Sequence, residues 1–187
     1  MARRPLTLPL DQPFVVRRST IAGQGAFATR DIAKGERVVE YLGERLTHAE
    51  SDARYDDHAH DAHHTFLFTV NRSVVIDAST GGNDARFINH ACDPNCESEV
   101  ERGRVFIDAI RRIRKGEELT YDYAYTRDGT ETREEESTLY GCRCGSRKCR
   151  GTILAPVSKA ERERLEALAR RRGRDRHAAS RTPRKHD

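Results

Sequence analysis

Three short blocks of unusual composition follow one another in the second half of the chain. They read Arg-Phe-Ile-Asn-His-Ala-Cys-Asp-Pro-Asn-Cys over residues 86–96, Gly-Glu-Glu-Leu-Thr-Tyr-Asp-Tyr over 116–123, and Gly-Cys-Arg-Cys-Gly-Ser-Arg-Lys-Cys over 141–149. The first offers polar side chains that can seat a cofactor, the second a phenol for a reaction centre, and the third thiols at the spacing of metal ligands. Their order indicates an active site that is closed by a metal-bound segment.

The thiols of the third block have the spacing C-x-C-x4-C, which is compact enough for Cys142, Cys144 and Cys149 to face one ion. Tetrahedral zinc takes four ligands, so the fourth must come from elsewhere in the chain. Cys92 and Cys96 are the only other cysteines, and either of them would tie the third block over the first. Reduced surface thiols or a redox pair are the alternative. Metal is favoured because three cysteines this close together in an intracellular protein usually bind one.

Charge is distributed unevenly along the chain of 187 residues, whose formal net charge is +4. Residues 157–187 hold 11 Lys and Arg against 5 Asp and Glu, so this tail carries +6 and the rest of the chain −2. The slightly acidic body favours a basic peptide as partner. The tail is either a solubilising extension or a contact for nucleic acid.

Membrane and export signals are missing from the sequence as given. No run approaches the roughly 18 apolar residues of a membrane span, and the first residues do not resemble a signal peptide. We therefore expect no membrane partner and an intracellular location, where thiols stay reduced. The Arg- and Ala-rich composition looks bacterial, which would mean the cytoplasm or nucleoid; secretion into a host nucleus is the alternative.

Short apolar runs separated by Gly, Asn, Asp and Lys-Gly turns predict a mostly-β body built from small strands. The runs cover residues 14–16, 25–28, 38–42, 65–70, 74–77, 105–110 and 119–123. Segments 30–38 and 111–119 also echo each other, because both contain Arg, Ile, Lys-Gly-Glu and a following apolar residue. Two copies are too few for a solenoid, so the echo predicts one turn, Lys-Gly leading into a strand, that is used twice.

Two helix starts are marked by capping boxes. Thr47 and Glu50 form the first box, which predicts a helix running toward residue 56. Ser158 and Glu161 form the second, which predicts a helix over 159–172.

Three further motifs precede the blocks: Ala22-Gly23-Gln24-Gly25, Glu40-Tyr41-Leu42-Gly43 and Val75-Ile76-Asp77-Ala78. All six, in this order, resemble the landmarks of the SET-domain family of protein lysine methyltransferases, specifically members with a zinc-binding post-SET segment. The resemblance covers the chain from about residue 14 to residue 153. It implies a flexible N-terminus (1–12), a SET domain (13–126), a post-SET segment with the zinc site (127–156) and a basic tail, helical and then disordered (157–187).

The resemblance implies a mostly-β fold of small curled sheets. In the family, the strand and turn that lead to Tyr123 thread the segment around Asn89 and His90 and form a pseudoknot. Composition alone would not suggest this topology, because threaded connections are rare. The resemblance also assigns the fourth zinc thiolate to Cys92 and leaves Cys96 free.

The implied reaction is methyl transfer from S-adenosylmethionine to the ε-amine of a lysine in a protein, with zinc in a structural role. Such a transfer is an in-line displacement at a carbon activated by its sulfonium, so the enzyme mainly aligns the reactants and supplies a neutral amine. Free lysine, with a pKa of about 10.4, is almost wholly protonated at neutral pH, and a narrow aromatic channel disfavours that charge. The residues suited to line this channel are Tyr41, Phe66, Tyr121 and Tyr123.

By resemblance, Tyr123 is the catalytic phenol, with Tyr121 and Tyr41 beside it. The expected cofactor contacts are Ala22, Gly23, Gln24, Gly25, Phe66, Asn89, His90 and Arg143. Family members carry Tyr or Phe at the position of Tyr121, and the phenol favours mono- or dimethylation over trimethylation. Phe66 stands where many relatives have tyrosine, a departure that bears on the product state and not on the reaction.

The expected substrate is a flexible basic segment that contains lysine, such as a histone tail or a bacterial DNA-associated protein. It would bind as an extra strand at a sheet edge. One alternative is a non-catalytic SET module that binds a peptide or partner protein, which the presence of Tyr123 together with Asn89 and His90 disfavours. The other is a nucleic-acid-binding protein that acts through its basic tail. The sequence does not predict the methylated lysine or the oligomeric state.

Overall fold

The computed structural model of the chain describes residues 12–55, 66–127, 137–157, 160 and 163–164. Three expectations therefore lie wholly or mostly outside the described residues: the N-terminal segment 1–12, the helix over 159–172, and the tail. Within the described part, no helix has the length and apolar character needed to cross a membrane.

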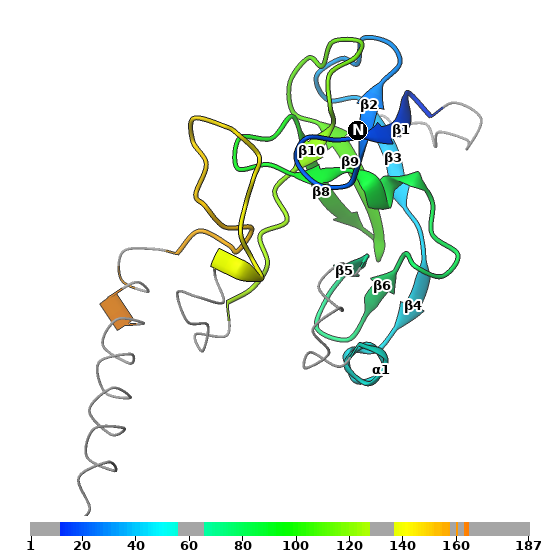
Figure 1. Cartoon of the computed structure of the whole chain (residues 1–187). Helices are drawn as coiled ribbons and strands as arrows, with labels where there is room; N and C mark the ends of the chain where they lie inside the picture. The colour runs from blue at the N-terminus through cyan, green and yellow to red at the C-terminus, as the bar shows by residue number, and fades with distance from the viewer. Residues whose placement is uncertain (1–11, 56–65, 128–136, 158–159, 161–162, 165–187) are drawn as a thin grey trace, which may run out of the picture.

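Short strands form four small sheets in the described part of the chain (Figure 1). Three sheets are antiparallel, with strand orders β1-β2, β3-β9-β8 and β4-β6-β5, and the fourth pairs β7 with β10 in parallel. Their bounds are β1 (Phe14–Arg18), β2 (Gln24–Ala28), β3 (Arg37–Tyr41), β4 (Glu44–Leu46), β5 (Leu67–Thr69), β6 (Val75–Asp77), β7 (Asn89–His90), β8 (Cys96–Glu101), β9 (Arg104–Ala109) and β10 (Thr120–Tyr121). The mostly-β expectation is confirmed.

Helical structure is confined to short pieces in the described residues. Helix α1 (His48–Arg54) begins where it was expected, because Thr47 and Glu50 form both hydrogen bonds of the capping box. A 3₁₀ helix, η2 (Asp84–Phe87), leads directly into β7 and was not expected from the sequence.

Strand β8 was also missed, for a physical reason. Its sequence, Cys-Glu-Ser-Glu-Val-Glu, buries little beyond its first residue and exposes most of the others. An edge strand of this kind takes its order from the hydrogen bonds to β9 rather than from an apolar face, so hydrophobic patterning cannot reveal it.

The two echoed segments adopt the same turn, as predicted, and they also contact each other. Ile32 and Ile113 are fully buried and exchange two backbone hydrogen bonds, of 2.9 and 3.0 Å. Each segment closes its turn with an arginine–glutamate pair, Arg30 with Glu36 at 2.7 Å in the first copy. The repeated turn therefore joins the start of β3 to the approach to β10, which are far apart in sequence.

The segment that leads to β10 passes the start of β8, where the side chain of Asn95 holds it. Asn95 is buried, with 1% of its surface exposed. Its amide nitrogen donates to the carbonyl oxygen of Glu118 at 2.7 Å, and its amide oxygen accepts from the backbone N–H of Thr120 at 2.8 Å. Because both ends of the amide bond to the passing chain, the segment before β10 is fixed against β8. This positions β10 beside β7, as the resemblance implied.

Candidate active site

An aromatic cluster connects β3, β5 and β10. Ring centroids lie 5.4 Å apart for Tyr41 and Phe68, 6.3 Å for Phe68 and Tyr121, and 4.9 Å for Tyr121 and Tyr123. Tyr125 continues the series at 5.8 Å from Tyr123. The structure thus brings together the three tyrosines predicted to act at the reaction centre, with Phe68 as the bridge between Tyr41 and Tyr121.

Phe66 lies at the side of this cluster rather than in its chain of rings. Its ring packs edge-on to Phe87, with centroids 5.7 Å apart, and its carbonyl oxygen accepts a hydrogen bond from the Tyr41 hydroxyl at 3.0 Å. Phe68 was not singled out from the sequence, although it lies two residues further along the same apolar run and belongs to β5, which begins just after Phe66. Alternation along the strand was the signal that could have found it.

The phenols of the cluster are protonated at neutral pH. Burial raises the pKa of Tyr41, Tyr121 and Tyr123 well above the ordinary phenol value. The Tyr123 hydroxyl donates to the carbonyl oxygen of Ile88 at 3.0 Å, whereas the Tyr121 hydroxyl has no hydrogen-bond partner among the described residues. These groups are therefore hydrogen-bond donors and not bases.

His90 lies between the backbone of Tyr123 and the thiol of Cys92. Burial lowers the pKa of His90 to about 4, so its imidazole is neutral at pH 7. Nδ1 accepts the backbone N–H of Tyr123 at 3.1 Å, which leaves the proton on Nε2, 3.3 Å from Cys92 Sγ. The neighbouring Asp122 carboxylate lies 3.5 Å from Nδ1 and forms no ion pair with a neutral ring.

Asn89 ties the glycine-containing loop before β2 to the site. Its amide nitrogen lies 3.3 Å from the Ala22 carbonyl oxygen, 2.9 Å from that of Gln24 and 2.9 Å from Oε1 of Glu118. Ser19 Oγ donates to the same carboxylate oxygen at 2.7 Å. Glu118, which was quoted in the second block without a role of its own, and Ser19, which no motif contained, thus fix the loop that was expected to hold the cofactor.

Gly25 has a protein neighbour that accounts for the glycine. A Cβ at this position would lie 2.2 Å from Oε1 of Glu118 and 2.9 Å from Ser19. The resemblance placed Gly25 among the expected cofactor contacts, and the structure adds a close approach within the protein that requires a residue without a side chain. Gly23 differs, because its φ of +40° lies in the region that favours glycine and nothing lies near its missing Cβ.

Four thiols gather at the C-terminal segment, from Cys92, Cys142, Cys144 and Cys149, and their Sγ atoms all lie within 4.8 Å of one another. Cys92 and Cys142 are 3.7 Å apart, close to the roughly 3.8 Å between two thiolates that each bind tetrahedral zinc at 2.3 Å. Backbone N–H groups donate to three of the sulfurs, from Arg150, Cys144 and Gly151. The donor set and spacing fit a structural zinc ion, with Cys92 as fourth ligand.

Cys96 is separate from this cluster and belongs to the core. We expect a chelator to expose the four clustered thiols to iodoacetamide and to leave Cys96 unmodified until the protein unfolds. Cys96 is 0% exposed, and burial raises its pKa to about 12, so its reactive thiolate is scarce at neutral pH. Mass spectrometry before and after chelation, and again in denaturant, measures the labelling. Equal labelling rates for Cys96 and Cys92 in the chelated native protein would contradict the assignment.

Arg143 and Phe66 are predicted cofactor contacts that no hydrogen bond or ring contact joins to Asn89 or to the loop from Ala22 to Gly25 in the described part of the chain. Arg143 lies between Cys142 and Cys144 in the sequence and is exposed.

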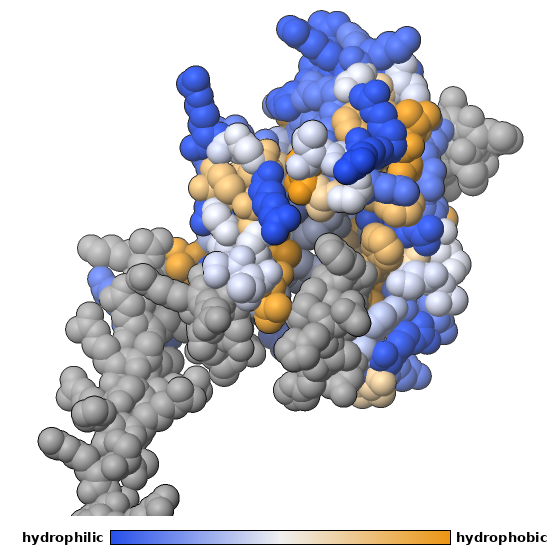
Figure 2. All heavy atoms as spheres, viewed as in Figure 1, coloured by the Kyte–Doolittle hydropathy of each residue, from blue (hydrophilic) through white to orange (hydrophobic). Residues whose placement is uncertain are grey.

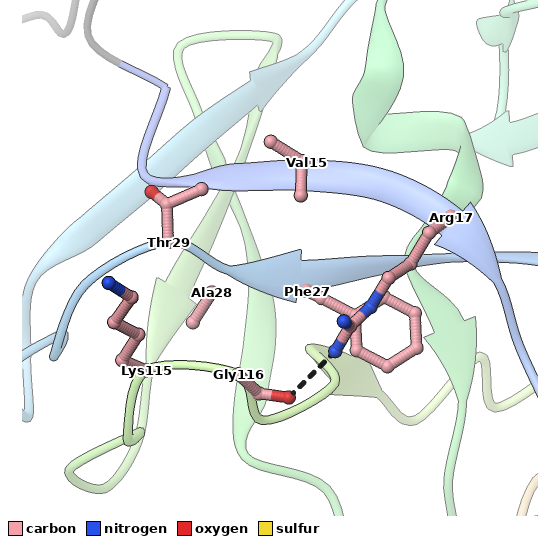
Figure 3. A pocket seen from close by; sticks show the side chains of 7 residues that line it. All are labelled: Val15, Arg17, Phe27, Ala28, Thr29, Lys115 and Gly116. Atoms are coloured by element: carbon pink, nitrogen blue, oxygen red, sulfur yellow. Dashed lines mark hydrogen bonds between the residues drawn. The ribbon is translucent and has the colours of Figure 1, made fainter.

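On the face drawn in Figure 2, apolar side chains appear as scattered areas among hydrophilic ones. A shallow hollow of about 350 Å³ lies on the β1-β2 hairpin, where the Arg17 guanidinium stacks over Phe27 and donates to the Gly116 carbonyl oxygen at 3.1 Å (Figure 3). None of the predicted site residues lines it, and its arginine is already occupied by these contacts.

Comparison with known proteins matches residues 23–124 to the SET domain model. Similar proteins include the histone-lysine N-methyltransferase trithorax of Drosophila melanogaster, 40% identical over 139 residues, 72% of this chain and 4% of the relative. The H3 lysine-4 specific histone-lysine N-methyltransferase of Saccharomyces cerevisiae is 38% identical over 147 residues, 76% of this chain and 13% of the relative. The chain therefore spans a small part of these relatives.

A solved structure, "ctPRC2 in an autoinhibited conformation bound to S-adenosylmethionine", contains a chain similar to this one. The TM-score is 0.55 at 34% identity, over 60% of this chain and 15% of that one.

Proposed function

The chain belongs to the SET-domain family, and on that premise we propose that it is a protein-lysine N-methyltransferase, which transfers the methyl group of S-adenosylmethionine to the ε-amine of a lysine in a protein substrate. The observation that carries the proposal is the parallel pairing of β7 with β10. Through it, Asn89 reaches the glycine-containing loop, and His90 accepts the backbone N–H of Tyr123. Residues expected to hold the cofactor are thereby joined directly to the expected catalytic phenol.

The cofactor site that we propose is formed by the loop from Ala22 to Gly25, by Asn89 and by His90. When bound, S-adenosylmethionine supplies a methyl group activated by its sulfonium. The polar groups here include the Glu118 carboxylate and the carbonyl oxygens of Ala22 and Gln24. Acceptors of this kind suit a cationic ligand, and the neutral state of His90 adds no competing positive charge.

The aromatic cluster would select a neutral amine. Buried rings of Tyr41, Tyr121 and Tyr123 disfavour an ammonium group, so the substrate lysine would lose its proton to solvent before it enters. A protonated Tyr123 cannot take that proton, and its hydroxyl instead orients the attacking nitrogen and the methyl group in line. Catalysis then rests on positioning.

The proposed substrate is a flexible basic segment of a histone or another DNA-associated protein. Support comes from the relatives named as histone-lysine methyltransferases and from the slightly acidic body of the chain. The exposed glutamates of the edge strand β8 fit such a partner as well. A contact of the tail with nucleic acid stays a prediction, which deletion of residues 157–187 would test.

The test is incubation of purified protein with labelled S-adenosylmethionine and a panel of histones, basic DNA-binding proteins and cell lysate. Label on lysine that is missing with Tyr123→Phe would support the proposal. Cofactor binding without transfer to any protein would instead favour the alternative, a non-catalytic SET module.

The product state is expected to depend on Tyr121. Its hydroxyl has no partner among the described residues and lies in a ring cluster that is closely packed. It would bind the amine and occupy space that further methyl groups need, so we expect the parent to give mono- or dimethyllysine and Tyr121→Phe to add more methyl groups. Mass spectrometry of the products over time measures this. A variant that adds no more methyl groups than the parent would rule the idea out.

A further inference from the structure

Arg150 connects the cysteine cluster to the segment that follows β10 and contains Tyr123. It follows Cys149 directly, and its guanidinium makes two parallel hydrogen bonds to Asp122: Nη1 to Oδ2 and Nη2 to Oδ1, each 2.8 Å long. Asp122 lies between Tyr121 and Tyr123. A bidentate arginine–carboxylate pair fixes orientation as well as distance, which a single point contact does not.

The same arginine has two further contacts that place it firmly. Its backbone N–H donates to Cys92 Sγ at 3.3 Å, and Nη2 also donates to the carbonyl oxygen of Leu154, a residue 1% exposed. The Arg150 and Asp122 side chains are 23% and 29% exposed, so water screens their attraction only in part. Arg150 thus contacts a predicted metal ligand, Cys92, the buried Leu154 of the C-terminal segment, and Asp122, which precedes Tyr123.

Asp122 passes this constraint to the backbone around Tyr123. Its Oδ1 accepts the N–H of Ala124 at 3.0 Å, and Ala124 has a φ of +46°, a conformation that costs a residue with a side chain roughly 1 kcal/mol or more. On the other side, the N–H of Tyr123 is held by His90. Tyr123 is therefore fixed between two contacts, and both lead back to Cys92.

A second ion pair also joins the C-terminal segment to the preceding chain, at the segment after β7, and serves as a comparison. Lys148 Nζ lies 3.0 Å from Asp93 Oδ1, but the two side chains are 74% and 51% exposed. An exposed lysine pair of this kind contributes roughly 0–1 kcal/mol and contacts no residue of the aromatic cluster. The difference in burial and geometry singles out the Arg150 pair.

We propose that Arg150 is a positioning residue that, through Asp122, makes the placement of Tyr123 depend on metal binding by the cysteine cluster. This inference rests on the proposed methyl transfer for its kinetic consequence. Its structural consequence, ordering of the backbone at Tyr123 and Ala124 by the loaded cluster, is independent of the reaction.

The kinetic test compares Asp122→Asn, Arg150→Gln, Arg150→Lys and the double variant Asp122→Asn/Arg150→Gln with the parent. We expect each of the two neutral variants to lower kcat about tenfold, with the KM for the cofactor changed less than about twofold. The double variant should be no worse than either single one, because the two residues act as a pair. Arg150→Lys should recover only part of the rate. The matched control, Lys148→Gln, should match the parent.

The second test needs no activity. Hydrogen exchange at the amides of Tyr123 and Ala124 is followed in zinc-loaded and chelator-treated protein. We expect chelation to raise exchange about tenfold in the parent and to add little in Asp122→Asn, where exchange is already fast although zinc content is unchanged. Equal exchange rates in the parent and in Asp122→Asn would overturn the inference. So would a kcat that falls only in those variants that have also lost zinc. If the parent protein transfers no methyl group to any substrate, the proposed function is refuted. The exchange data would still test whether metal binding orders the backbone at Tyr123 and Ala124.

Discussion

Tyr123→Phe is expected to lower kcat on the order of 10²-fold or more and to leave the fold intact. The substitution removes one oxygen, whose hydrogen bond in this structure goes to the carbonyl of Ile88 at 3.0 Å. The ring, which contacts Tyr121, His90 and Tyr125, stays in place. Since the hydroxyl is proposed to align the nitrogen and methyl group during transfer, kcat and kcat/KM should fall together.

Measurement requires the rate, the affinity and the fold of the same variant. Steady-state kinetics give kcat and KM, calorimetry gives cofactor affinity, and circular dichroism gives the unfolding midpoint. Tyr55→Phe is the matched control: it removes the same atom from a phenol that donates to Asp77 at 2.9 Å, outside the aromatic cluster. The control should lose some stability and keep its kcat. A Tyr123→Phe variant with weaker cofactor binding and unchanged kcat would assign the phenol to binding.

The features that the sequence predicted well are those written in neighbouring residues. The capping box at Thr47 depends on contacts three residues apart, and its helix was found. The thiol spacing identified three zinc ligands, but the choice between Cys92 and Cys96 came from the family resemblance. The reason is structural: the short segment between them ends in β8, which turns Cys96 into the core and leaves Cys92 beside the C-terminal segment.

The features that were missed depend on chain crossings. Glu118 reaches Ser19 across 99 positions of sequence, and Arg150 reaches Asp122 across 28. No local pattern marks an acidic or basic residue as the partner of a distant one, because the same residue types cover any solvated surface. The order of the motifs predicted which segments contact one another. Which side chains pair between those segments could be seen only in the structure.

Arg37→Met is expected to destabilise the fold by about 3–5 kcal/mol, the largest effect on stability among these predictions. Arg37 joins β3 to β9 through Asp108, with Nε–Oδ1 at 3.1 Å, and also pairs with Glu101 of β8. The Arg37 and Asp108 side chains are 7% and 4% exposed, so the variant leaves a carboxylate buried without the two donors that Arg37 supplies. The guanidinium also lies 3.8 Å from the centre of the Phe106 ring.

Arg104→Met provides the matched control, because Arg104 stacks on the same Phe106 ring at 4.9 Å and pairs with Glu40. Its side chain is 44% exposed, so its loss should cost about 1 kcal/mol or less. Urea unfolding at constant zinc concentration compares the two variants with the parent. Arg37→Met/Asp108→Asn should recover part of the loss, because the buried charge is then gone. Equal stability losses for Arg37→Met and Arg104→Met would mean that the cation–ring contact, and not the buried pair, holds the sheet.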